Sequence, residues 1–396
     1  MPEPAGSAPL RVLFVNRMAS MVRGGGETFD LEIARHLDSL GAETSFLSGI
    51  PLFSSAATPL DPPRSHTIRS PYTGWFPWDR VPQGWRLRVW DFERFEAAAT
   101  RWILARQDRY DIVQICEMPP LVNRLKDGGC RLPVVMRITA PDYHDPRRGV
   151  QLADALLASG VSIARLRDGI RPDTIDIPNG VDTERFAPRP SDYRARRGIP
   201  ADAFVVLFVA RFQQVKNHAM LLDAFRRLRA ARPDARLVLV GSGPLESLLR
   251  SLLRQHRLED AVIIEGEVAF PDVPALYNAA DVHVISSHSE SFSFATLEAM
   301  ASGLPLVVTA TEWIPGLIGH DEGGRVVPLD DAPAFAAALA ELAADPGLRA
   351  RMGERNRRAA VERHGWHASA RKLLDVYHGL LGRVSGFPNP APGPTS

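Results

Sequence analysis

Two glutamates, Glu290 and Glu298, stand eight positions apart in residues 281–309, a run that alternates strand, turn, helix, turn and strand. A helix expected to begin near Ala295 would place Glu290 in the preceding loop and Glu298 in its first turns, facing one ligand. The free amides and positive dipole at such a helix start suit a phosphate, and Thr296 adds a hydroxyl there. Carboxylates repel phosphate, so we expect them to bind neutral hydroxyls of a ribose or sugar. The alternative is a surface helix that carries two unrelated glutamates.

Basic residues and glycines follow other strands of the predicted fold. Arg211 and Lys216 come after a strand expected at residues 204–209, where they are credible anion ligands, although exposed basic residues in loops are common. Glycines 24–26 follow the first strand and allow backbone to approach a phosphate or sugar closely. Glycines 241 and 243 follow a further strand but lack the third glycine of a dinucleotide fingerprint. The pattern therefore favours a diphosphate site over a dinucleotide site.

The spacing of apolar residues along the chain predicts the helices and strands that position these residues. Short β-branched runs alternate with longer stretches of helical period, which predicts an α/β fold of parallel strands joined by crossover helices. The alternation occurs twice. Strands are expected at 11–15, 43–47, 111–115, 134–138, 155–158 and 174–177, and again at 204–209, 236–240, 262–265, 282–286, 306–309 and 325–327. Helices are expected at 27–40, 333–344, 347–364 and 366–381.

This alternation predicts two Rossmann-like domains, at residues 1–183 and 184–365, connected by a turn-rich charged stretch at 178–200. Residues 51–92 interrupt the first domain with many prolines and with four of the seven tryptophans, Trp75, Trp78, Trp85 and Trp90. We expect a loop-rich insertion there, whose aromatics either stack on a sugar or apolar acceptor or simply pack onto the domain. Residues 385–396 are expected to form a disordered tail.

Composition excludes several classes. The formal charge of +1, from 47 basic and 46 acidic residues, gives no electrostatic basis for binding nucleic acid. The two cysteines, Cys116 and Cys130, show neither metal-ligand spacing nor a disulfide framework, which favours a reducing cytoplasm. No apolar run approaches the roughly 20 residues of a membrane helix, and the amino terminus lacks the pattern of a signal peptide. A cytoplasmic protein without a transmembrane segment is expected.

The run from Glu290 to Pro305 resembles retaining glycosyltransferases of family 4, which pair two glutamates at this spacing. Other segments agree in order: 209–212 with 216–218, 239–244, the Asn-Gly turn at 178–182 and the glycine loop at 24–27. The resemblance is close over residues 204–327 and covers the first half only through its glycine loop, residues 153–155 and the Asn-Gly turn. It implies a GT-B fold, in which two Rossmann-like α/β/α domains face a central cleft. The donor then lies in the C-terminal domain, the acceptor in the N-terminal domain, and a helix at 366–384 crosses back.

The resemblance also implies roles for individual residues. Arg211 and Lys216 would neutralise the donor diphosphate, Glu290 would position a sugar hydroxyl, and Glu298 would hold the nucleotide ribose. Arg211, Lys216 and Glu290 are the residues expected to act in catalysis. The full set expected to bind the donor is Gly25, Gly26, Arg211, Lys216, Gly241, Glu290, Ser291, Phe292, Ser293, Thr296 and Glu298.

Three departures from the family pattern limit what is carried over. The histidine that usually contacts the donor sugar is absent after residues 134–138, and Arg137, Thr139 or His144 could replace it. Ser291 stands where the family has a glycine. Its side chain leaves less space for sugar hydroxyls to approach the backbone. Only about a dozen residues separate 141 from 153, so the acceptor side is trimmed and acceptor identity is not inherited.

The expected function is transfer of a sugar from a UDP-sugar or GDP-sugar to a small-molecule, saccharide or lipid-linked acceptor, with retained configuration. No metal and no cofactor is expected, because cationic side chains and amides can meet the leaving group and the chain has no Asp-x-Asp triplet. The alternatives are a GT-B-type epimerase or hydrolase, or a catalytically weak sugar-nucleotide binder. Peripheral membrane contact stays open. The alanine- and arginine-rich composition suggests a bacterial origin, with natural-product or cell-envelope glycosylation.

Overall fold

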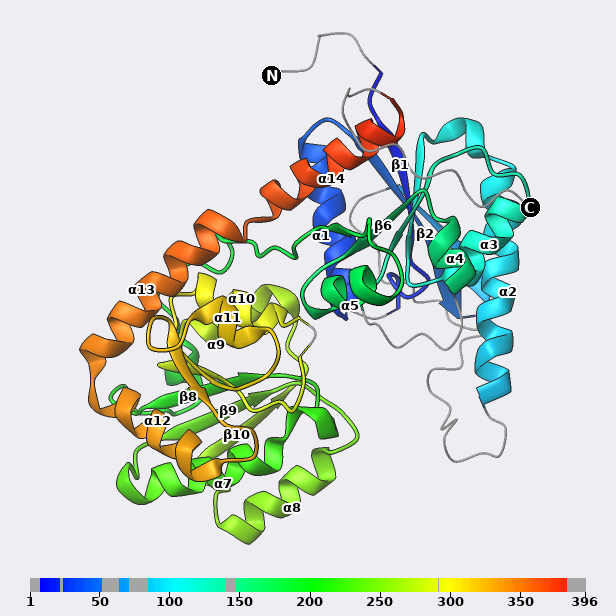
Figure 1. The fold of residues 1–396 in the computed structure, drawn as a ribbon. Helices are drawn as coiled ribbons and strands as arrows, with labels where there is room; N and C mark the ends of the chain where they lie inside the picture. Colours follow the sequence, from blue (N-terminus) through cyan, green and yellow to red (C-terminus); the bar gives the residue numbers. More distant parts are fainter. Residues whose placement is uncertain are drawn as a thin grey trace. The chain divides into compact units, whose positions relative to one another are not determined.

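The computed structural model describes residues 8–21, 24–51, 64–70, 85–139, 147–290 and 292–382. The chain divides by its contacts into two compact units. Unit 1 comprises Met1–Asn179 together with Trp366–Ser396, and unit 2 comprises Gly180–Gly365. Each unit is a parallel sheet flanked by helices (Figure 1). The chain thus changes unit at the expected Asn-Gly turn and again just before the last helix.

Unit 1 contains a seven-stranded parallel sheet in the order β3-β2-β1-β4-β5-β6-β7. Its strands are β1 (Arg11–Val15), β2 (Glu43–Pro51), β3 (Ser65–Ser70), β4 (Ile112–Cys116), β5 (Val134–Arg137), β6 (Ala155–Ala158) and β7 (Ile175–Asp176). Its helices are α1 (Gly25–Ser39), α2 (Trp85–Leu104), α3 (Pro119–Asp127), α4 (Arg147–Leu152), α5 (Val161–Gly169) and α14 (Trp366–Leu380), with a 3-10 turn η2 (Gln107–Arg109). The strand order reverses between β1 and β4, which is where open α/β sheets bind ligands.

Unit 2 contains a six-stranded parallel sheet in the order β10-β9-β8-β11-β12-β13. Its strands are β8 (Val205–Val209), β9 (Arg236–Val240), β10 (Val262–Gly266), β11 (Val282–Ile285), β12 (Leu306–Thr309) and β13 (Gly324–Val327). Its helices are α6 (Tyr193–Arg196), α7 (His218–Ala231), α8 (Glu246–His256), α9 (Val273–Tyr277), α10 (Phe294–Ala301), α11 (Ile314–Ile318), α12 (Ala332–Ala344) and α13 (Pro346–Arg363), with 3-10 turns η3 (Gln214–Lys216) and η4 (Phe270–Asp272). Here the order reverses between β8 and β11.

Strand β8 shows why these apolar runs form buried strands. Val206 and Phe208 belong to the core on one face of the sheet, and Val205 and Leu207 belong to the core on the other. Side chains of a strand alternate between faces, so a continuous apolar run is buried only when helices cover both faces. Full burial of such a side chain contributes about 1.5–3 kcal/mol. The central strands of unit 2 are therefore packed on both faces, and this packing positions the loops that follow them.

The expected loop-rich insertion at 51–92 is wrong for the part that the structure describes. Strand β3 pairs in parallel with β2 and extends the sheet, and α2 already begins at Trp85. The strand was missed because most of its side chains are exposed, as befits an edge strand, so no apolar run marks it. Trp85 and Trp90 are 60% and 44% exposed, so neither is packed into the domain. Trp75 and Trp78 lie outside the described residues, as does the expected tail at 385–396.

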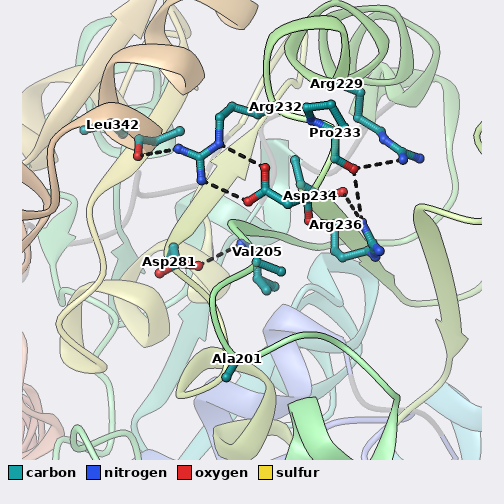
Figure 2. A network of polar contacts seen from close by, with 12 residues as sticks. Ala201, Val205, Arg229, Arg232, Pro233, Asp234, Arg236, Asp281 and Leu342 are labelled. Atoms are coloured by element: carbon teal, nitrogen blue, oxygen red, sulfur yellow. Dashed lines mark hydrogen bonds and ion pairs between the residues drawn. The ribbon is translucent and has the colours of Figure 1, made fainter.

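A polar network ties together the amino-terminal ends of the unit 2 strands (Figure 2). Asp281 directly precedes β11 and accepts a hydrogen bond from the Val205 amide at 2.7 Å, where β8 begins. Arg232 pairs with Asp234 through both carboxylate oxygens, just before β9. This network lies at the end of the sheet opposite to the ligand-binding ends of the strands. It therefore holds the strands in register rather than forming a site.

Asp30 of α1 carries a buried carboxyl group. It is 1% exposed and accepts a hydrogen bond from Asn16 Nδ2 at 2.8 Å. Burial raises the pKa of Asp30 from 3.8 to about 6, although Arg137 and Asn16 oppose the change. Because the pKa is higher in the folded state, the folded state binds the proton more tightly. The contribution of this group to stability is therefore greatest below pH 3.8 and is lost as the pH rises through 6.

We expect Asp30→Asn to raise the free energy of unfolding at pH 7 by up to about 3 kcal/mol, because the amide cannot ionise. At pH 4 the carboxyl of the folded wild-type protein is already protonated, so the gain should be much smaller. Urea unfolding of both proteins between pH 4 and pH 7.5 measures this difference. If the difference in unfolding free energy did not increase with pH, the raised pKa of Asp30 would be contradicted.

Candidate functional site

Lys216 and Glu290 meet at the point of unit 2 where the strand order reverses. Lys216 ends η3 after β8, and Glu290 lies in the loop after β11. Lys216 Nζ is 2.6 Å from Glu290 Oε1, and the two side chains are 21% and 7% exposed. Ser287 Oγ donates to the same oxygen at 2.6 Å. The structure thus brings together two of the expected site residues from adjacent strands.

Hydrogen bonds lock the loops after β8 and β11 to each other. Ser286 Oγ donates to the Lys216 carbonyl at 2.8 Å, and the His288 amide donates to the Val215 carbonyl at 2.8 Å. Asn217 Nδ2 donates to Asp330 Oδ1 at 2.7 Å, and His288 Nε2 lies 2.8 Å from the same oxygen. The cluster of Asn217, His288 and Asp330 was not expected from the sequence, because its members are far apart in the chain. It connects the loops that carry Lys216 and Glu290 to the segment after β13.

Helix α10 begins one residue before the expected position. Ser293 is its N-cap, and its Oγ accepts the Thr296 amide at 3.3 Å. Thr296 is fully buried, and its Oγ1 has no hydrogen-bond partner among the described residues. The Phe292 ring packs against Trp313, with centroids 4.6 Å apart. Ser291 lies outside the described residues. Ser293 therefore caps this helix, Thr296 is buried beside it, and Phe292 packs against Trp313.

Glu298 lies in the second turn of α10 and is partly exposed. Tyr277 of α9 donates a hydrogen bond from its hydroxyl to Glu298 Oε2 at 2.8 Å. Tyr277 was missed at the sequence level, because nothing in its spacing distinguishes it from a core aromatic. The second expected carboxylate is thus oriented by a buried neighbour.

The loops after β8 and β9 are in close backbone contact beside Arg211. The Phe212 amide donates to the Ser242 carbonyl at 2.8 Å, while the Arg211 side chain is exposed. Gly241 has φ +134°, and a Cβ added there would lie 2.1 Å from the Ala210 carbonyl oxygen. The glycine is therefore required by the close approach of the two loops. This contact positions the backbone on either side of Arg211.

We expect Gly241→Ala to lower the stability of unit 2 by about 2 kcal/mol or more, because the new Cβ meets rigid backbone and the φ angle is unfavourable for alanine. Gly316→Ala is the matched control, since a Cβ at that position of α11 meets nothing within 4 Å. Thermal unfolding of the two variants measures the difference. Equal melting temperatures would show that the loops after β8 and β9 move apart at little cost, and that Gly241 is not required there.

In unit 1 the glycine loop becomes the start of α1. Gly25 and Gly26 form the first turn of this 15-residue helix, and the Gly24 amide donates to Glu27 Oε2 at 3.0 Å. A Cβ on Gly26 would lie 3.3 Å from Cys116 Sγ, so this turn packs against the end of β4. The helix start therefore lies at the reversal point of the unit 1 sheet, as a phosphate-approaching loop requires.

The three residues expected to replace the family histidine have different surroundings. Arg137 is 2% exposed, stacks 3.6 Å above the Phe29 ring and donates to Asn179 Oδ1 at 3.1 Å, so it is part of the interior. The Thr139 amide donates to Glu117 Oε1 at 2.9 Å, and Glu117 has a positive φ of 54°. His144 lies outside the described residues. The interior position of Arg137 argues against its contacting a sugar.

Other features of the described residues bear on metals and membranes. They contain no group of three or more His, Cys, Asp or Glu residues arranged to hold a metal ion. No helix among them is both long and apolar enough to cross a membrane. A surface pocket of unit 2 does not coincide with the expected site. It is lined by Tyr193, Arg196, Arg197, Glu265, Val268, Asp272 and Leu276.

Sequence comparison finds relatives that match part of the chain. The D-inositol 3-phosphate glycosyltransferase of Thermobispora bispora is 35% identical over 249 residues, which cover 59% of this chain and 58% of the relative. The protein of the same name from Kineococcus radiotolerans is 39% identical over 220 residues, 51% of this chain and 50% of the relative. The matched segments thus span about half the length of these curated relatives.

Solved structures resemble the chain over most of its length. Sucrose-phosphate synthase from Thermosynechococcus elongatus has a TM-score of 0.77 at 20% identity, covering 95% of this chain and all of that one. HepE from Anabaena, solved with UDP and glucose, has a TM-score of 0.74 at 20% identity, covering 94% of this chain and all of that one. These likenesses establish the fold, which is the GT-B type with two Rossmann-like units.

The family described as "Glycosyl transferases group 1" matches residues 191–359, a segment that lies entirely within unit 2. The matched segment includes the ion pair of Lys216 with Glu290. It also includes Glu298, which accepts the hydrogen bond from Tyr277. Residues 191–359 therefore match the glycosyl transferases group 1 family, within a chain whose fold is of the GT-B type.

Proposed function

We propose that this protein is a retaining glycosyltransferase that moves a sugar from a nucleotide-diphosphate sugar to an acceptor hydroxyl, without a metal or other cofactor. The observation that carries the proposal is the contact of Lys216 with Glu290 at the reversal point of the unit 2 sheet. A cation beside a carboxylate at such a point matches a ligand that has both an anionic group and neutral hydroxyls.

The chemistry requires positive charge at the leaving group. As the bond between the sugar and the diphosphate breaks, the sugar gains oxocarbenium character and the diphosphate gains negative charge. Lys216 and the exposed Arg211 meet that charge. An ammonium has three donor hydrogens, so Lys216 can keep its bond to Glu290 while it donates to diphosphate oxygens. Fixed donors that meet developing charge lower the barrier without reorganisation.

The two carboxylates orient the donor and do not react. Glu290 accepts a hydrogen bond from a hydroxyl of the transferred sugar, and Glu298 accepts from the ribose. The acceptor hydroxyl attacks the anomeric carbon from the side of the leaving group, and its proton passes to the departing phosphate oxygen. The new glycosidic bond therefore keeps the configuration of the donor, and no covalent bond to the protein forms.

The donor class is proposed from the ligand of a structural neighbour. Anabaena HepE, which shares the fold, was solved with UDP and glucose, and this favours a UDP-sugar as the first candidate. The family match is confined to unit 2, so it says nothing of the acceptor side. The acceptor is proposed only as a hydroxyl-bearing small molecule, saccharide or lipid-linked compound.

A two-stage experiment tests the proposal. A thermal-shift screen with UDP, GDP, ADP and their hexose derivatives identifies the donor, because a ligand that binds only the folded state raises the melting temperature. The chosen donor is then incubated with a panel of acceptors in excess EDTA, and NMR determines the anomeric configuration of the product. We expect a retained configuration and no effect of EDTA. Inversion or loss of activity in EDTA would overturn the mechanism, and binding without transfer would indicate a sugar-nucleotide binder.

A further inference from the structure

The buried phenol of Tyr277 is directed at Glu298. Tyr277 is 0% exposed at the end of α9, and its hydroxyl lies 2.8 Å from Glu298 Oε2 and 3.3 Å from the Ala295 carbonyl oxygen. A hydroxyl has one hydrogen to donate. The shorter contact, to a charged acceptor, is the stronger of the two, so the hydrogen is directed at Glu298.

The surroundings of Tyr277 keep this hydroxyl a donor. Burial, together with the Glu298 charge, raises the pKa of Tyr277 well above its ordinary value of 10.0. The nearby His283 is fully buried, and burial lowers its pKa to about 3, so it is neutral and does not attract the carboxylate. Tyr277 is therefore a protonated neutral donor throughout the physiological pH range.

Aromatic neighbours fix the ring that carries the hydroxyl. The Phe186 ring meets Tyr277 edge-on with centroids 5.7 Å apart, and the His283 ring lies 5.6 Å away. Such aromatic pairs contribute about 0.5–1.5 kcal/mol beyond the area that they bury. The ring is fully buried between these neighbours, so the surrounding core sets the position of the hydroxyl that contacts Oε2 of Glu298.

We propose that Tyr277 is a positioning residue, whose hydrogen bond holds the Glu298 carboxylate in the orientation that accepts the ribose hydroxyls of the donor. The inference deepens the proposed function and rests on it. A carboxylate on a flexible side chain has several rotamers, and binding a diol through it costs the entropy of selecting one. The hydrogen bond from Tyr277 fixes one rotamer of the Glu298 side chain before the nucleotide binds, so that entropy is not lost on binding.

The test is the discrimination between a ribonucleotide and its dideoxy analogue. Calorimetric Kd values are measured for the nucleoside diphosphate among UDP, GDP and ADP that binds the wild-type chain most tightly, and for its 2′,3′-dideoxy form. We expect the wild-type protein to prefer the ribonucleotide at least about tenfold. In Tyr277→Phe the Kd of the ribonucleotide should rise about tenfold while that of the dideoxy form stays within about twofold. For the sugar donor, KM should rise and kcat should change little.

Tyr377→Phe is the matched control, because Tyr377 is also fully buried but donates to Gln114 Oε1 in unit 1. It should keep the wild-type preference. Equal weakening of both ligands by Tyr277→Phe would indicate a merely structural role and overturn the inference. Should the phenylalanine variant fail to fold, Tyr277→Met, similar in size and also without a hydroxyl, is expected to give the same loss of preference.

The outcomes separate this inference from the proposal on which it rests. If the wild-type chain binds none of the three nucleoside diphosphates, the proposed function fails. If the wild-type protein binds and prefers the ribonucleotide and Tyr277→Phe keeps that preference, only the role of Tyr277 fails. If the wild-type protein binds both forms equally, the ribose role of Glu298 fails together with the inference.

Discussion

Replacing Lys216 by alanine is expected to lower kcat by about two orders of magnitude, the usual effect of removing one charge-stabilising donor. The side chain is the cation that the structure holds against Glu290, at 2.6 Å, where the strand order of unit 2 reverses. Without it the diphosphate leaves with less compensation of its charge, and the nearly buried Glu290 carboxylate loses its counterion. Steady-state kinetics with the donor identified by the binding screen measure the change.

Lys126→Ala is the control for this variant. Lys126 Nζ forms an ion pair with Asp154 Oδ2 at 2.5 Å in unit 1, and its side chain is 23% exposed, close to the 21% of Lys216. It should lose a comparable ion pair and keep near-normal kcat. Lys216→Arg, which retains the charge, should recover part of the activity. Similar rates for Lys216→Ala and Lys126→Ala would remove Lys216 from the mechanism.

The second large effect is expected for Glu298→Ala, which should lower kcat/KM for the donor at least about tenfold. The variant removes the acceptor of the ribose hydroxyls and leaves the buried Tyr277 hydroxyl without its carboxylate partner. Most of the loss should appear in KM, since the ribose is distant from the bond that breaks. The melting temperature of the variant shows whether the buried hydroxyl also costs stability.

Glu341→Ala is suited as its control, because Glu341 lies on α12, pairs with Arg325 of β13 and is 47% exposed. The pair lies partly at the surface, so its loss should lower stability by about 1 kcal/mol and leave turnover unchanged. Wild-type KM in Glu298→Ala would mean that the carboxylate does not hold the nucleotide.

The sequence predicts the central strands and the start of α10 because both depend on local signals. Apolar runs such as that of β8 are buried on both faces, and their length and β-branched content identify them. The start of α10 was placed within one residue, since Ser293 is a good N-cap. The contact of Lys216 with Glu290 was not itself predicted, because it depends on the adjacency of strands β8 and β11, which precede the two residues in the chain.

What the sequence does not predict depends on tertiary surroundings. Strand β3 is an edge strand whose exposed side chains give no apolar signal. Arg137 is one of the three residues expected to replace the family histidine, yet Phe29 and Asn179 hold it in the interior. Thr296 looks like an accessible helix-start hydroxyl in the sequence, but it is fully buried. Tyr277 and Glu298 are 21 positions apart, and only the packing of α9 beside α10 brings them together.

A crystal structure of the chain with its best-binding nucleoside diphosphate tests the central claim most directly. The account predicts diphosphate oxygens within hydrogen-bond distance of Lys216 Nζ and ribose hydroxyls on the Glu298 carboxylate, with Glu290 still beside Lys216. A nucleotide bound elsewhere, for example in the pocket beside Tyr193 and Glu265, with Lys216 contacting only Glu290, would contradict it.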